Sequence, residues 1–191
     1  MDDPFERFAN WFAEAEQREP NNPGAMSVAT VDTHGRPSSR MVLLRGFDAR
    51  GFVFYTNLES RKGHDLRTNA YVALCFHWKS LDRQVRIEGK TQIVNAEEAD
   101  AYFASRPKDS QIGAWASKQS EPLTARFELE TRVAKYGVLY GIGKVPRPPF
   151  WSGYRVVPDA IEFWEERPFR LHDRTQYRLG ADGWQSTKLF P

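Results

Sequence analysis

Three groups of polar side chains in this sequence have the types and spacing to bind an anion. The first combines the hydroxyl groups of Tyr55 and Thr56 with the cations Arg61 and Lys62, which follow Ser60 at the start of a predicted helix. The N–H groups and dipole of a helix N-terminus favour an anion, and cationic side chains add charge-assisted hydrogen bonds. This group predicts a phosphate site, with a solvated Arg-Lys pair as the structural alternative.

A second group consists of Tyr102, Arg106 and Ser110, which are spaced four residues apart. Tyr102 and Arg106 would share one face of a helix, whereas Pro107 is expected to end that helix before Ser110. A guanidinium group between two hydroxyl groups is a second candidate anion site. Taken alone, this spacing is a weak signal.

The third group, Arg170, His172 and Arg174, occupies alternate positions. An extended segment would place all three side chains on one face. Like charges on one face repel each other, so this group predicts a bound anion or electron-rich group, with Trp164 and Phe169 as flat apolar neighbours. The structural alternative is a set of ion pairs with nearby carboxylates, namely Glu162, Glu165, Glu166 and Asp173.

Two further cations, Arg40 and Arg45, flank the apolar run Met41–Leu44. We expect them at the two ends of one strand. Positions five apart point to opposite faces of a strand, so the two cations need not hold the same group.

Several other chemistries lack support in the sequence. The four histidines are far apart and Cys75 lies in an apolar run, so no zinc-ligand spacing is present and no metal site is expected. No GxSxG, GxGxxG or GxxxxGK[ST] sequence occurs, which argues against a serine hydrolase and against nucleotide binding through those loops.

Composition indicates a soluble globular protein. The chain has 191 residues, 40% of them hydrophobic, and a net charge of +2 that gives no reason to expect nucleic-acid binding. A single cysteine fits a reducing compartment. We see no signal peptide and no apolar run long enough to span a bilayer, so a cytoplasmic location without membrane contact is expected. Aromatic residues make up 14% and include six Trp, which suits a core, an interface or a flat ligand.

The elements that would position these groups are mostly strands. Residues 1–20 read as a helix, because Asp3 can cap it and Phe5, Phe8, Phe12 and Ala15 recur at helical spacing. Further helices are expected at Ser60–Asn69, Ala96–Ser105 behind Asn95, and within 109–141. The predicted strands are Ala25–Val31, Ser39–Phe47, Phe52–Asn57, Tyr71–Trp78, Arg83–Val94, Tyr154–Val157, Ala160–Glu165, Arg174–Leu179 and Trp184–Leu189. This pattern favours an α+β fold with an antiparallel barrel or curled sheet.

In this order, the groups resemble the pyridoxamine 5'-phosphate oxidase family from about Ala25 to Pro191. The matching stretches are Arg40–Leu44, Phe54–Asn57, Ser60–Lys62, Arg83–Val85, Ser105–Ala114, Ser117–Ser120, Glu162–Trp164 and Arg170–Arg174. The resemblance implies a split β-barrel with inserted helices that forms a homodimer and binds FMN between two subunits. It implies one domain over residues 1–191, with 150–191 completing the barrel and active site. The implied reaction oxidises pyridoxine or pyridoxamine 5'-phosphate to pyridoxal 5'-phosphate, with O2 as acceptor and H2O2 released.

The resemblance also implies roles for individual residues. The catalytic pair would be Arg170 and His172. The phosphorylated pyridine substrate would contact Arg45, Tyr102, Arg106, Ser110, Arg170, Leu171 and His172. FMN would contact Arg40, Met41, Val42, Leu43, Leu44, Tyr55, Thr56, Arg61, Lys62, Gln84, Gln119, Ser120, Trp164 and Arg174.

Three departures from the family pattern stand out. Arg45 occupies the position of a substrate-phosphate lysine, and Asn22 stands where an acidic residue is common. The sequence also begins at the first helix, without the basic arm that precedes it in some members. Three alternatives remain open: a phenazine-biosynthesis flavin oxidase, a flavin- or deazaflavin-dependent reductase on the same barrel, and a non-catalytic protein that binds FMN or pyridoxal phosphate.

Overall fold

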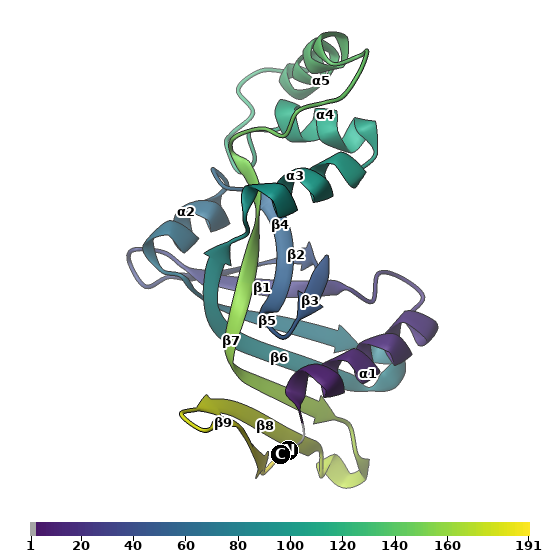
Figure 1. Cartoon of the computed structure of the whole chain (residues 1–191), viewed down its shortest axis with the longest axis vertical. Helices are drawn as coiled ribbons and strands as arrows, with labels where there is room; N and C mark the ends of the chain where they lie inside the picture. Colours follow the sequence, from purple (N-terminus) through teal and green to yellow (C-terminus); the bar gives the residue numbers. More distant parts are fainter. Residues whose placement is uncertain (1–2) are drawn as a thin grey trace.

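The computed structural model describes residues 3–191 and shows an α+β protein built on a curled antiparallel sheet (Figure 1). Strands β1 to β7 follow the order β2-β1-β5-β6-β7-β4-β3, while β8 pairs with β7 and β9 pairs with β8. The strands are β1 (Ala25–Val31), β2 (Pro37–Leu43), β3 (Gly46–Asp48), β4 (Gly51–Asn57), β5 (Tyr71–Trp78), β6 (Arg83–Ile93), β7 (Trp151–Glu165), β8 (Asp173–Gly180) and β9 (Gly183–Leu189). The predicted fold class is confirmed.

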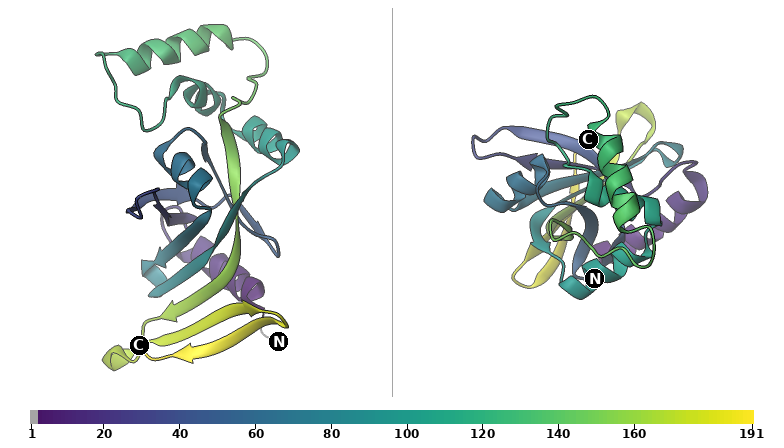
Figure 2. Two further views of the ribbon diagram at one scale, coloured as in Figure 1. Left: turned by 90° about the vertical axis from the view of Figure 1, so that its left-hand side faces the viewer. Right: turned by 90° about the horizontal axis from the view of Figure 1, so that it is seen from above.

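Three of the helices lie together at one end of this sheet. Helices α3, α4 and α5 gather at one end of the long axis, whereas the start of α1 and the β8–β9 hairpin lie at the other (Figures 1 and 2). The helices are α1 (Pro4–Arg18), α2 (Arg61–Thr68), α3 (Ala96–Ser105), α4 (Lys108–Ala116) and α5 (Glu128–Leu139), with short 3-10 turns η1 (Lys79–Leu81) and η2 (Pro168–Arg170).

The N-terminal helix forms as its sequence predicts. The Asp3 carboxylate accepts a hydrogen bond from the Phe5 N–H at 2.8 Å and caps α1. Phe8 and Ala15 are fully buried in the main core, and Trp11 is buried beside them. Packing of this apolar face against the sheet stabilises α1, because an isolated helix of this length is only marginally stable in water.

The predicted strand Ser39–Phe47 is wrong, because the chain breaks into β2 and β3 at residues 44 and 45. The Leu44 N–H donates to the Gly24 carbonyl, whereas the Arg45 N–H donates to the Val53 carbonyl. The backbone thus changes from the β1 side of the sheet to the β4 side between these two residues. Arg45 therefore lies outside the strand that carries Arg40.

The two strands predicted at Tyr154–Val157 and Ala160–Glu165 form one strand, β7. Proline in a strand usually marks an edge or a bulge, and here the register with β6 shifts at Gly89, which faces Pro158. The bulge accommodates the proline without ending the strand. β7 then pairs with β4 through its first half and with β8 through its second half.

The predicted helices in the middle of the chain are confirmed with one refinement. Asn95 caps α3 through the Glu98 N–H at 2.7 Å, and Pro107 separates α3 from α4 as expected. The helix-favouring stretch 109–141 contains parts of two helices, α4 and α5, joined by residues 117–127. Over the described residues 3–191, none of the helices has the length and apolarity to cross a membrane.

Gly89 provides a test of the β6–β7 bulge. A Cβ atom at this position would lie 2.1 Å from the Val157 carbonyl oxygen and 2.7 Å from the Pro158 Cα. Because backbone atoms cannot yield as side chains do, we expect Gly89→Ala to lower the free energy of unfolding by roughly 2 kcal/mol or more. Urea denaturation at fixed protein concentration measures it. The control Gly46→Ala adds a Cβ in open space, and equal losses in both variants would contradict the prediction.

Candidate active site

A cleft of about 450 Å³ lies between the sheet and helices α3 and α4. It brings together residues from β2, β4, α3, α4 and the start of β7. Nine predicted site residues line it: Val42, Leu43, Arg45, Tyr55, Thr56, Tyr102, Arg106, Ser110 and Gln119. The predicted cluster of Arg45, Tyr102, Arg106 and Ser110 is thus assembled in one place.

Three stacked aromatic rings form one wall of this cleft. The ring centroids of Tyr55 and Tyr102 are 3.9 Å apart, and those of Tyr55 and Trp151 are 5.3 Å apart, with nearly parallel planes. Gly153, which faces Tyr55 across β4 and β7, gives the Tyr55 ring its space, since a Cβ there would lie 2.8 Å from a ring carbon. Burial raises the pKa of Tyr55 to about 12, so its hydroxyl group stays protonated at neutral pH.

Arg106 lies at the end of α3 against this wall. Its guanidinium carbon is 4.9 Å from the Trp151 ring centroid, a cation–π distance. Burial lowers the pKa of Arg106, and the nearby charge of Arg45 lowers it further. The buried Nη1 atom makes no hydrogen bond to any residue between 3 and 191. A buried cationic donor without a partner is costly, so this atom points to an anion in the cleft.

Lys62 forms the centre of a second polar cluster at the N-terminus of α2. Its Nζ atom donates to the hydroxyl groups of Thr56 at 2.8 Å and Ser60 at 3.2 Å, and to Gln119 Oε1 at 3.1 Å. Burial lowers the pKa of Lys62 to about 8, and the charge of Arg40 contributes. Arg61 and Lys62 occupy the first turn of α2, where the helix dipole disfavours cations. Both facts fit a site that binds a phosphate group.

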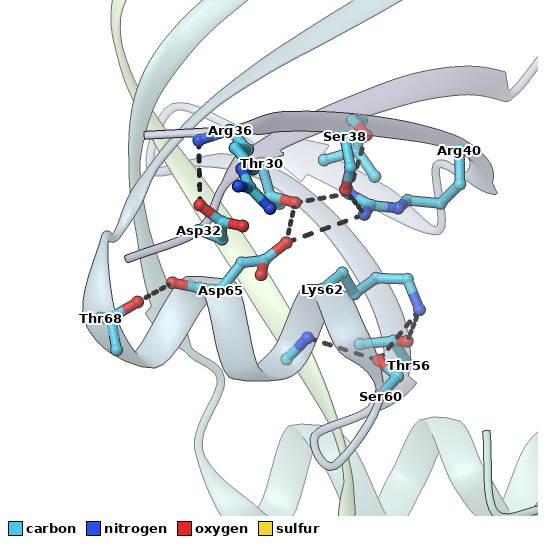
Figure 3. A network of polar contacts seen from close by, with 12 residues as sticks. Thr30, Asp32, Arg36, Ser38, Arg40, Thr56, Ser60, Lys62, Asp65 and Thr68 are labelled. Atoms are coloured by element: carbon cyan, nitrogen blue, oxygen red, sulfur yellow. Dashed lines mark hydrogen bonds and ion pairs between the residues drawn. The ribbon is translucent and has the colours of Figure 1, made fainter. Parts of the chain in front are cut away.

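Arg40 reaches the same region from β2 (Figure 3). Its guanidinium donates to the Thr30 hydroxyl at 2.7 Å and to the Ser38 hydroxyl. The Asp65 carboxylate lies 3.9 Å from Arg40 Nη2. A groove of about 600 Å³ continues from here along Arg61, Gln119 and Ser120. Gln119 lines both this groove and the first cleft, and so connects the two.

The run Met41–Leu44 contributes unevenly to these sites. Val42 and Leu43 line the cleft, whereas Met41 is 65% exposed and the Leu44 side chain is buried in the main core. Leu44 does not line the cleft, and its contact with FMN stays a prediction.

The predicted extended face of Arg170, His172 and Arg174 is wrong. Phe169 and Arg170 adopt positive φ values of 59° and 61° in η2, and only Arg174 lies in a strand. His172 packs on Trp164 with ring centroids 4.6 Å apart and accepts a hydrogen bond at Nδ1 from the Arg167 N–H. Arg170 and His172 line a separate cleft of about 460 Å³, and Leu171 between them is 68% exposed.

Gln84, Trp164 and Arg174 form a row across β6, β7 and β8, because the sheet register places them opposite one another. Arg174 pairs with the buried Glu162 carboxylate at 2.9 Å. One of the ion pairs expected under the structural alternative is therefore present. The row lies at the far end of β7 from Trp151.

The two candidate substrate groups are far apart within one chain. Tyr102 and Arg106 belong to the end with α3, whereas Arg170 and His172 lie near β8 at the opposite end (Figure 1). Trp164 lies thirteen positions after Trp151 in β7, which corresponds to about 40 Å along a strand at ~3.3 Å per residue. One copy of the chain does not bring all predicted substrate contacts together.

Sequence reasoning missed several residues that the structure places at these sites. Trp151 completes the aromatic wall, and Asn57, Gly113, Ala114 and Ser117 also line the first cleft. Trp151 is the first residue of β7, and its only sequence signal is its place between the Pro-rich stretch 146–149 and the strand predicted from Tyr154. Thr30 and Asp65 gave no signal, because a buried hydroxyl and a helical carboxylate are common structural residues.

Comparison with known proteins agrees with this geometry. A family model described as pyridoxamine 5'-phosphate oxidase matches residues 12–140, and one described as the pyridoxine 5'-phosphate oxidase C-terminal dimerisation region matches residues 151–191. A pyridoxine/pyridoxamine 5'-phosphate oxidase from Rhodospirillum rubrum is 60% identical over 194 residues, covering 99% of this chain and 96% of the relative. One from Caulobacter vibrioides is 60% identical over 190 residues, covering 100% of this chain and 86% of the relative.

Solved structures show the same fold. PhzG from Burkholderia lata 383, in complex with tetrahydrophenazine-1-carboxylic acid, has a TM-score of 0.94 at 31% identity, covering 100% of this chain and 94% of that chain. An FMN-binding protein related to pyridoxamine 5'-phosphate oxidase from Nostoc punctiforme has a TM-score of 0.78 at 15% identity, with full coverage of both chains. With most of its length matched by the family model and by relatives at 60% identity, this chain belongs to the pyridoxamine 5'-phosphate oxidase family.

Proposed function

We propose that this protein is an FMN-dependent oxidase that converts pyridoxamine 5'-phosphate and pyridoxine 5'-phosphate to pyridoxal 5'-phosphate, with O2 as acceptor and H2O2 released. The observation that carries the proposal is the buried Arg106 nitrogen without a partner, in one cleft with Arg45, Tyr102 and Ser110. Relatives at 55–60% identity over nearly the whole chain carry the name of this activity. The unpaired Cys75 is consistent with action in the cytoplasm.

The residues fit FMN as the cofactor. Lys62, Arg40 and Arg61 supply the positive charge for its phosphate group, and Gln119 lies beside them. The half-buried row of Gln84, Trp164 and Arg174 offers polar and aromatic contacts for the rest of the flavin. When bound, FMN supplies the redox chemistry, and the protein binds, orients and tunes it.

A homodimer resolves the separation between the two substrate groups. Residues 151–191 match the family's dimerisation region and include the segment with Arg170 and His172. We propose that this segment of one subunit meets the Arg106 cleft of the other, with FMN between them. The exposed side chains of Phe169, Leu171 and Phe190, at 91%, 68% and 95%, are apolar surface that such an interface would cover.

In the proposed complex, Arg45, Tyr102, Arg106 and Ser110 hold the substrate phosphate and so fix the pyridine ring. Positioning of this kind can account for several kcal/mol of barrier reduction. Arg170 would hold the ring and stabilise developing negative charge. The hydrogen bond from the Arg167 N–H to His172 Nδ1 places the proton of neutral His172 on Nε2, where it can be donated.

The decisive experiment for the proposed reaction measures bound flavin, aldehyde and peroxide in the purified protein with each of the two substrates. We expect a yellow protein that forms aldehyde and peroxide in equal amounts. A yellow protein without turnover would instead identify a storage or binding protein.

The likeness to PhzG favours one other candidate, an oxidase of a tricyclic phenazine precursor. The identity to that protein is 31%, against 60% to the pyridoxine/pyridoxamine 5'-phosphate oxidases. A phenazine precursor that carries a carboxylate instead of a phosphate would use the Arg106 cleft differently. Turnover of tetrahydrophenazine-1-carboxylic acid above that of pyridoxamine 5'-phosphate would establish this alternative.

The lowered pKa of Lys62 leads us to expect that FMN binding depends on pH. Its pKa of about 8 in the free protein means that it is charged below this pH and neutral above it. A bound phosphate group favours the charged form and raises this pKa, so FMN binding takes up a proton above pH 8. We expect FMN affinity to fall as pH rises through about 8, by up to roughly tenfold per pH unit.

Fluorescence titration of the apoprotein between pH 6.5 and 9.5 measures this effect. Lys62→Met should bind FMN more weakly and lose the dependence above pH 8. Riboflavin, which lacks the phosphate group, serves as the control ligand. An unchanged pH profile in Lys62→Met would refute the assignment.

We expect Arg106 to contribute to the affinity for the substrate phosphate. Replacement by Gln removes the charge while keeping donors, so we expect KM for pyridoxamine 5'-phosphate to rise roughly tenfold or more, the range of a lost charged hydrogen bond. The FMN content should stay at the wild-type value, because Arg106 lies in the other cluster. Steady-state kinetics and flavin absorbance measure the two. Arg50→Gln, which changes an exposed arginine in the turn before β4, is the matched control; an FMN loss without a KM change would count against the role.

We expect Arg170 to contribute to the turnover rate and not to FMN binding. We expect Arg170→Leu to lower kcat by roughly 100-fold, since it removes a charge proposed to act on the reacting ring, while FMN content stays near wild type. Stopped-flow reduction of the bound flavin by substrate measures this step directly. Arg178→Leu, at an exposed position of β8, controls for the loss of an arginine. Loss of FMN with unchanged turnover per bound flavin is the result that would contradict the role.

A further inference from the structure

Thr30 and Asp65 form a buried polar pair behind Arg40 (Figure 3). Thr30 lies in β1 with no exposed surface, and Asp65 lies in α2 with 6% exposed. The Thr30 hydroxyl donates to Asp65 Oδ2 at 2.6 Å and accepts from Arg40 Nη1 at 2.7 Å. Neither residue lines the first cleft, so neither is placed to touch a substrate there.

The directions of these hydrogen bonds form a relay. The hydroxyl group of Thr30 has one proton, and Asp65 accepts it. The lone pairs of the same oxygen are therefore turned toward Arg40, which has only donors. Thr30 thus transmits the position of the α2 carboxylate to a guanidinium on β2.

Arg40 needs such a restraint because its neighbours are cations. Burial lowers the pKa of Arg40 and of Lys62. The charge of Arg61 lowers the pKa of Arg40 further, and the charge of Arg40 lowers that of Lys62 further. Before a phosphate group binds, these like charges repel one another. Asp65 is the carboxylate whose charge opposes this effect, and it acts to raise the pKa of Arg40. Without the pair, the flexible Arg40 side chain could turn away from its neighbours.

We propose that Thr30 and Asp65 are positioning residues, which hold the Arg40 guanidinium in the orientation that receives the flavin phosphate. The proposal rests on the proposed function, because it assigns the Arg40 cluster to that phosphate. The effect of the pair is confined to the phosphate group. It can therefore be measured as the ratio of the dissociation constants for riboflavin and FMN. A general loss of protein stability would not change this ratio.

The test compares two substitutions of Thr30 in the full-length apoprotein. Thr30→Val keeps the branched shape and removes the hydroxyl group, whereas Thr30→Ser keeps the hydroxyl group and removes a methyl group. Fluorescence titration with FMN and with riboflavin gives the two dissociation constants. We expect Thr30→Val to weaken FMN binding roughly tenfold with riboflavin binding unchanged, as for the loss of a charged hydrogen bond. Thr30→Ser should keep the wild-type ratio.

A double-mutant cycle shows whether the effect passes through Arg40. In an Arg40→Gln background, Thr30→Val should change the FMN-to-riboflavin ratio by less than about twofold, because the group it positions is gone. An equal loss in both backgrounds would overturn the proposal. So would equal weakening of FMN and riboflavin by Thr30→Val, since that is the result of a purely structural defect.

Asp65→Asn provides a second test of the proposal if Thr30→Val does not fold. Asparagine keeps an acceptor for Thr30 but removes the charge that restrains Arg40, so the preference for FMN should fall. A rise in this preference would show that Asp65 acts only as a charge opposing the phosphate, and would overturn its positioning role. Wild-type protein that binds FMN no better than riboflavin would instead overturn the assignment of this cluster in the proposed function.

Discussion

Strand β7 pairs along both of its edges, and this pairing sets the positions of the candidate site. One edge is hydrogen-bonded to β6 for nearly the whole length, while the other meets β4 first and β8 afterwards. Trp151 at its start and Trp164 near its end are therefore held at a fixed separation. The bulge at Gly89 and Pro158 lets this continue through a proline that would otherwise interrupt the strand.

In our proposal, this long strand leaves the active site incomplete within a single chain. It carries the aromatic wall and the Arg106 cleft at one end, and the Trp164–His172 contact at the other. The whole of β7, with β8 and β9, also falls in the region matched as a dimerisation region. The same strand therefore serves the fold of one subunit and, in our proposal, the active site of the other.

Charge is the second constraint on the site. Arg40, Arg61 and Lys62 gather at the N-terminus of α2, and burial lowers the pKa of Lys62 to about 8. Such a cluster is unfavourable in the free protein and becomes favourable when a phosphate group binds. The Thr30–Asp65 pair offsets part of this strain from within the sheet and helix. The same argument applies in the first cleft, where the half-buried Arg106 lies near the charge of Arg45.

The sequence by itself determined the local structure and the residue types of the site. The caps at Asp3 and Asn95 and the N-terminal helix depend on neighbouring residues, and these features form as predicted. The grouping of Tyr102, Arg106 and Ser110 was also readable, because a helix and a proline fix their spacing. Only the tertiary structure decided that Arg45 leaves its strand, that Lys62 is buried, and that Arg170 lies in a turn far from Arg106. Those outcomes depend on backbone pairing and burial between segments far apart in the chain, and spacing along the sequence carries no information about either.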